Sequence, residues 1–159
     1  MSSIAKTNSL RILDAAAVAY QPVEYPVSDN LIDAVSVAKK INLPQEQCFK
    51  TLVTVNPSKE YFVFVIPAGT ELDLKKAAKV SGSKSIVMIP QKELFPLTGF
   101  IHGGCSPIGM KKQFPVFIDE TAQLFDTIGV SGGRVGLSVI LAPESLSCVT
   151  GAVFADLTR

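Results

Sequence analysis

The order of helical and strand patterns in this chain predicts an α+β fold with a mixed, strongly curved sheet. Short strands and short helices are interspersed and joined mostly by turns, which does not match the regular alternation of a doubly wound sheet. Hydrophobic residues make up 47% of the chain and charged residues 18%, a composition typical of a globular protein. With 159 residues, the chain is long enough for one sizeable core, so we expect a single domain over residues 1–159.

Helices are predicted where apolar residues recur every three or four positions between capping and breaking residues. They are expected at 7–17, from Asp29 or Asn30 to Ile41, at 74–80, at 91–94 and at 143–146. Gly82 should end the third of these, because glycine readily takes the left-handed conformation that closes a helix. Pro143 stands at the favoured first position of the last.

Strands are predicted where β-branched and aromatic residues cluster between turn residues. They are expected at 20–26, 48–55, 61–66, 85–89, 116–119, 124–130, 137–141 and 152–155. Pro22 and Pro26 confine the first strand to an edge or an end, because proline cannot donate to a sheet ladder. The turn at 56–60 should join its two flanking strands into a hairpin at the centre of the sheet.

One lysine interrupts the strand predicted at 48–55. Strand alternation places Lys50 on the same face as Cys48, Leu52 and Thr54, an unusual neighbourhood for a solvated ammonium. A lysine within a strand is often a surface or edge charge. From the residues alone, both a surface role and a binding role remain open for Lys50.

Charge and cysteine content exclude few functions. The chain has 15 basic and 14 acidic residues, a balance that neither requires nor excludes a nucleic-acid partner. Cys48, Cys105 and Cys148 are widely separated, without the spacing of a disulfide framework or a zinc site. The N-terminus lacks an apolar signal segment, and no apolar run approaches the ~20 residues that span a bilayer. We therefore expect a cytoplasmic protein with no metal, no cofactor and no membrane partner.

Two glycine-rich stretches are candidates for ligand contact. Residues 103–109 lack the Gly-Lys-Ser/Thr ending of a phosphate loop, but paired glycines let the backbone approach a ligand closely. A tight corner in a curved sheet explains them equally well. The second stretch, 130–136, is expected between two strands, where Ser131 could bond a ligand.

The sequence offers no convincing protein nucleophile. No G-x-S-x-G elbow is present, and His102 is the only histidine. We expect Cys105 and His102 to lie on opposite faces of a strand, three positions apart, which argues against a Cys/His dyad. A thiol enzyme that uses Cys105 therefore remains a minor alternative.

Taken together, five segments in order resemble the YbaK/EbsC family over nearly the whole chain. They are FKTLV at 49–53, LDLKK at 72–76, TGFIHGGCSPIG at 98–109, FIDE at 117–120 and VSGGR at 130–134. The family is related to the editing insertion domain of bacterial prolyl-tRNA synthetases, and its members are free-standing deacylases of wrongly charged tRNA. The resemblance implies a mixed, partly open β-barrel with packed helices.

The resemblance also implies roles for particular residues. Lys50 would lie in the substrate pocket near the tRNA acceptor end, and Gly103 and Gly104 would hold the aminoacyl group through backbone contacts. The same pocket would be lined by Tyr25, Thr51, Ser106, Pro107, Ser131 and Ser138. Ser138 stands where relatives specific for cysteine carry an aspartate. In relatives that act on Cys-tRNA, the thiol of the substrate itself is proposed to attack the ester, so no protein nucleophile is required.

The expected function is that of a trans-editing aminoacyl-tRNA deacylase, with Cys-tRNA(Pro) as the first candidate substrate. Its expected partners are mischarged tRNA, in the first place tRNA(Pro), and, as a further candidate, prolyl-tRNA synthetase. The alternative is a non-catalytic module on the same fold that binds tRNA, a nucleotide or a synthetase. Surface lysines that could contact phosphates, or simply face solvent, are Lys75, Lys76, Lys79, Lys111 and Lys112.

Overall fold

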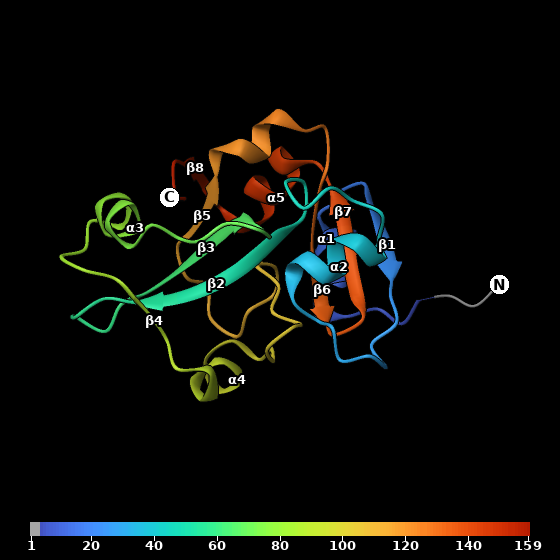
Figure 1. Cartoon of the computed structure of the whole chain (residues 1–159), viewed down its shortest axis with the longest axis horizontal. Helices are drawn as coiled ribbons and strands as arrows, with labels where there is room; N and C mark the ends of the chain where they lie inside the picture. The colour runs from blue at the N-terminus through green and yellow to red at the C-terminus, as the bar shows by residue number, and fades with distance from the viewer. Residues whose placement is uncertain (1–3) are drawn as a thin grey trace.

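The strands of this protein form two sheets (Figure 1). The computed structural model describes residues 4–159. A three-stranded antiparallel sheet has the order β1 (Tyr20–Glu24), β7 (Leu137–Leu141), β6 (Ile128–Arg134). A five-stranded mixed sheet has the order β4 (Val87–Met88), β2 (Phe49–Val55), β3 (Tyr61–Pro67), β5 (Val116–Asp119), β8 (Val153–Ala155).

The predicted α+β class with a mixed sheet is confirmed, whereas the barrel is not. β2 pairs antiparallel with β3 and β4, and β5 runs parallel to both β3 and β8. Between Ile4 and Arg159 the two sheets are joined only by an isolated parallel bridge between Cys48 and Gly129. Because one bridge does not continue a ladder, the strands turn from one sheet to the other without closing a barrel.

Helices lie against both sheets. They are α1 (Asn8–Ala15), α2 (Ala34–Lys40), α3 (Leu74–Ser81), α4 (Leu94–Thr98) and α5 (Pro143–Thr150), with short 3₁₀ helices η1 (Gln91–Glu93) and η2 (Glu120–Leu124). Gly82 closes α3 with φ of 69°, and Pro143 opens α5, both as predicted. None of the helices between residues 4 and 159 is long and apolar enough to cross a bilayer.

Two predicted element boundaries are wrong. α2 begins at Ala34 with Asp33 as its N-cap, because Asp29 and Asn30 form a turn in which Asn30 has φ of 59° and the Asp29 carboxylate accepts from the Leu31 N–H. The second glycine stretch does not separate two strands: β6 runs through it to Arg134. Its pairing with β7 shifts register between Ser131 and Arg134.

The main core lies between the two sheets. Val63 and Val65 of β3 face this cluster, which also contains residues from β6, β7, α1 and α5. The alternate residues Phe62 and Phe64 face a second cluster beneath α3. β3 is therefore apolar on both faces, and the β2–β3 hairpin lies inside its sheet, as predicted.

Candidate functional site

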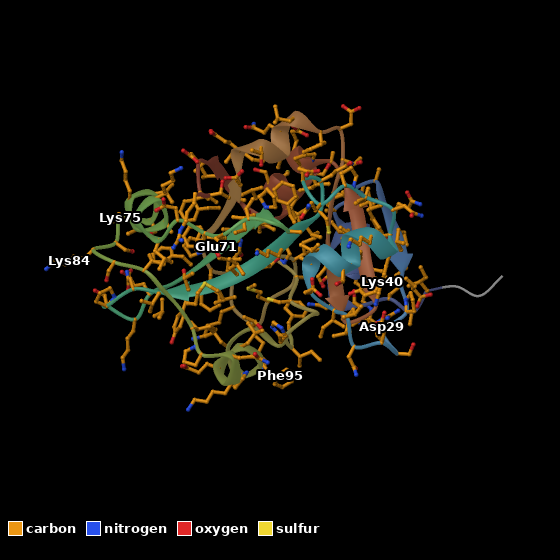
Figure 2. All side chains as sticks on the ribbon, viewed as in Figure 1. Asp29, Lys40, Glu71, Lys75, Lys84 and Phe95 are labelled. Carbon is orange, nitrogen blue, oxygen red and sulfur yellow. The ribbon has the colours of Figure 1, made fainter. Side chains whose placement is uncertain are left out.

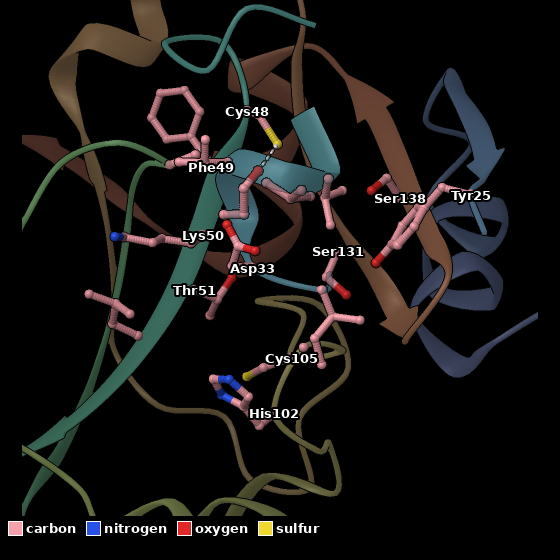
Figure 3. A pocket seen from close by; sticks show the side chains of 18 of the residues that line it. Tyr25, Asp33, Cys48, Phe49, Lys50, Thr51, His102, Cys105, Ser131 and Ser138 are labelled. Carbon is pink, nitrogen blue, oxygen red and sulfur yellow. Dashed lines mark hydrogen bonds between the residues drawn. The ribbon is translucent and has the colours of Figure 1, made fainter. Parts of the chain in front are cut away.

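A cavity of about 500 Å³ lies beside β2, at the junction of the two sheets (Figure 3). Four segments build its wall: the entry to α2, the first half of β2, the loop after α4, and the paired strands β6 and β7. Its lining residues are Tyr25, Ile32, Asp33, Ala34, Val35, Val37, Cys48, Phe49, Lys50, Thr51, Leu52, Ala68, Leu94, His102, Gly103, Cys105, Val130, Ser131 and Ser138.

Four hydroxyl-bearing residues expected at the site lie on this wall: Tyr25, Thr51, Ser131 and Ser138. Ser131 and Ser138 are direct cross-strand partners on β6 and β7, and the Ser131 hydroxyl accepts a bond from the Gly133 N–H at 3.2 Å. The Thr51 hydroxyl is buried and has no hydrogen-bond partner in residues 4–159. An unpaired buried hydroxyl costs ~1–3 kcal/mol. A ligand that bonds to Thr51 would remove this cost.

Lys50 borders the same cavity but points away from its hydroxyl-lined end. Figure 3 shows its side chain extending from β2 on the side opposite Ser131 and Tyr25. Burial lowers the pKa of the Lys50 ammonium, and the negative charge of Glu71 partly offsets this effect. No ion pair involves Lys50 in the described chain. The ammonium is thus a half-buried cation without a fixed partner.

The segment from Tyr25 to Asp33 forms one wall of the cavity and is held in place by Lys40. The Lys40 ammonium, on α2, donates to the Pro26 carbonyl at 2.7 Å, to the Asp29 carboxylate at 2.7 Å and to the Leu31 carbonyl at 2.9 Å. Burial raises the pKa of the Tyr25 hydroxyl. The hydroxyl is therefore a neutral hydrogen-bond donor on this wall.

Asp33 and Ile32 are site residues that the sequence analysis missed. The Asp33 carboxylate caps α2 by accepting from the Ser36 hydroxyl at 2.7 Å and the Ser36 N–H at 3.1 Å, and these bonds lower its pKa. An aspartate three residues before a serine at the start of an apolar helical pattern is an N-cap signal that could have located the turn. No local signal marks Ile32.

The turn expected to line the pocket as a unit, from Gly103 to Pro107, does so only through Gly103 and Cys105. Gly104 packs against β6: a Cβ there would lie 2.8 Å from the Val135 nitrogen, and its own N–H already donates to the Ile101 carbonyl. Ser106 is fully buried and accepts from the Ile108 N–H at 3.1 Å. Pro107 borders a different cavity. These three predicted contacts are corrected, because the chain turns away from the pocket after Gly103.

His102 and Cys105 do not lie on opposite faces, as was predicted. Residues 102–105 form a turn and a loop rather than a strand, so alternation does not apply, and both side chains reach the cavity (Figure 3). Burial raises the pKa of the Cys105 thiol to about 12 and that of the Cys48 thiol to about 11. Both thiols are therefore protonated and poorly nucleophilic at neutral pH.

The described residues contain no group of three or more side chains arranged to hold a metal ion. What the site can do chemically follows from its hydroxyl groups, its backbone at Gly103 and the free cation of Lys50. Such a wall can orient a small polar molecule and interact with negative charge at its edge.

Comparisons with known proteins define the class to which this fold and site belong. Residues 29–147 match the sequence model of the aminoacyl-tRNA editing domain family. The chain belongs to this family, and the resemblance to the YbaK/EbsC group is confirmed.

Individual relatives agree with this assignment. The chain is 45% identical, over 96% of its length and 93% of the relative, to an Enterococcus faecalis protein named "Putative Cys-tRNA(Pro)/Cys-tRNA(Cys) deacylase EbsC". Its fold matches a solved structure titled "Crystal structure of a putative trans-editing enzyme for prolyl tRNA synthetase" with a TM-score of 0.81 and 26% identity, covering 98% of this chain and 99% of the other. A hypothetical protein, APE2540, shares the fold with a TM-score of 0.85 at 19% identity, covering 94% of this chain and 97% of the other. The expected enzyme class, aminoacyl-tRNA deacylase, is the one that the first two names describe.

Proposed function

We propose that this protein hydrolyses, in trans, the ester of a small amino acid wrongly attached to tRNA, with Cys-tRNA(Pro) as its first substrate. The observation that carries the proposal is the unpaired Thr51 hydroxyl in a cavity lined by further hydroxyl groups and bordered by a partner-free lysine. Membership of the editing family supports the reaction class. The name of the Enterococcus faecalis relative supports cysteine as the amino acid.

The chemistry fits a substrate that supplies its own nucleophile. The sulfur of the esterified cysteine attacks its own carbonyl carbon, and the bond between this carbon and the ribose oxygen breaks. The ribose oxygen keeps the electron pair and takes the thiol proton, which releases free tRNA and a cyclic thioester that water then opens. In this scheme the protein orients and does not attack, which agrees with the raised pKa values of its own two buried thiols.

The roles within the site follow from position. Tyr25, Thr51, Ser131 and Ser138 would orient the amino acid by hydrogen bonds, and the backbone at Gly103 would lie against it. Lys50 would attract the negatively charged acceptor end, because its ammonium has no competing partner. Prolyl-tRNA synthetase remains a candidate partner that could deliver the mischarged tRNA.

The proposal is tested by incubating the protein with tRNA(Pro) charged with cysteine, serine or alanine. We expect Cys-tRNA(Pro) to lose its amino acid at least about tenfold faster than the other two, because alanine has no internal nucleophile and a serine hydroxyl is a weaker one. The measurement is the fraction of labelled aminoacyl-tRNA that remains with time, relative to protein-free hydrolysis. Binding of all three without any loss of the amino acid would instead identify a non-catalytic module.

Replacing Cys105 by alanine should leave the rate of Cys-tRNA(Pro) deacylation within about twofold of the parent rate. The Cys105 thiol, with its pKa raised to about 12, is not ionised at neutral pH and cannot serve as the attacking group. The matched control is Cys148→Ala, which alters an exposed thiol outside the cavity. A hundredfold loss in Cys105→Ala alone would instead support the thiol enzyme.

A further inference from the structure

An exposed aromatic ring lies on the same short helix that closes one side of the cavity. Leu94, the first residue of α4, lines the cavity, and Phe95, the next, is 54% exposed. Large aromatic side chains are seldom left this exposed without a partner. Figure 2 shows Phe95 on α4, at the edge of the molecule below β2.

A lysine is held over this ring. The Lys111 ammonium lies 5.2 Å from the centre of the Phe95 ring. Two features fix this geometry: the Lys111 N–H donates to the Thr98 carbonyl at 2.9 Å, and the lysine side chain packs on Gly99, where a Cβ would lie 3.2 Å from the Lys111 Cγ. The end of α4 thus presents a stacking surface and a positive charge side by side.

The exposed ring is connected to the cavity by further exposed residues. Ile101 is 55% exposed, and His102 is exposed while also lining the cavity. Unpaired nucleotides are commonly bound by a ring on which a base stacks and a cation near the adjoining phosphate. The combination of charge, aromatic surface and continuity with the cavity favours a single-stranded nucleic acid.

We propose that Phe95 and Lys111 bind the unpaired 3′ end of the tRNA: one base stacks on Phe95 and a neighbouring phosphate contacts Lys111, while the esterified amino acid enters the cavity. The choice of tRNA as the occupant rests on the proposed function. The surface deepens that function by assigning where the acceptor end is held.

The test uses two fluorescein-labelled RNA hairpins with the same stem, one with an unpaired ACCA 3′ end and one blunt. We expect the parent protein to bind the unpaired end more tightly, as measured by fluorescence anisotropy. Phe95→Ala should weaken this binding about tenfold and leave the blunt hairpin unaffected, whereas Phe95→Tyr, which can still stack, should keep it. Lys111→Ala should weaken binding severalfold and reduce the salt dependence by about one phosphate contact.

The matched control is Lys84→Ala, which removes an exposed lysine near α3 (Figure 2). Equal binding of both hairpins by the parent, or unchanged binding by Phe95→Ala, would overturn the inference. Deacylation keeps its failure separate from that of the proposed function. If the parent deacylates Cys-tRNA(Pro) and Phe95→Ala matches it at every RNA concentration, only the inference falls. If the parent binds the unpaired end through Phe95 but deacylates nothing, only the proposed function falls.

Discussion

Replacing Lys50 by alanine is expected to lower kcat/KM for deacylation of Cys-tRNA(Pro) by about 100-fold. The Lys50 ammonium is half-buried and has no ion-pair partner in residues 4–159, so its charge is available to the substrate. A hydrogen bond to a charged group contributes ~1.5–3 kcal/mol, which corresponds to roughly ten- to a hundredfold in rate. Initial rates with labelled aminoacyl-tRNA measure the effect.

Two companion variants show whether charge or position matters at this site. Lys50→Arg keeps the charge but changes the geometry of the donor and should retain part of the activity. Lys84→Ala removes an exposed lysine that lies outside the cavity and should behave like the parent. Parent-like activity in Lys50→Ala would show that the lysine has no role in binding or orienting the substrate.

Replacing Gly104 by alanine is expected to destabilise the protein by about 3 kcal/mol, near the upper end of the range for an overpacked site. The new Cβ would lie 2.8 Å from the Val135 nitrogen and 2.9 Å from the Arg134 carbonyl carbon. Both are backbone atoms at the end of β6, so neither can move without displacing a cavity wall. Because the chain has no tryptophan, urea unfolding followed by far-UV circular dichroism is the suitable measurement.

The matched control for this substitution is Gly82→Ala. Gly82 also has a special role, with φ of 69°, but a Cβ there would have no atom within 4 Å. Only the left-handed conformation then opposes the new side chain, at ~1–2 kcal/mol. If the two variants lost the same stability, close packing of the 103–104 turn against β6 would not be what requires glycine at position 104.

Local patterns predicted much of the fold because the forces behind them act over a few residues. Alternation placed Val53 in the main core and Leu52 against the second cluster, and Gly82 ended α3 because a left-handed residue was needed there. The resemblance to an editing family, carried by five short motifs, also pointed to Thr51 and Ser131. Both lie on the cavity wall.

What the sequence by itself determined was therefore the hairpin around Lys50, most helix boundaries and the family. The tertiary structure alone decided which residues share the cavity. The bridge from Cys48 to Gly129 brings β6 beside β2, and the turn at Gly103 brings His102 and Cys105 to one wall. The same turn removes Ser106 and Pro107 from it. These placements depend on contacts between segments distant in the chain, for which neither periodicity nor capping residues carry a signal.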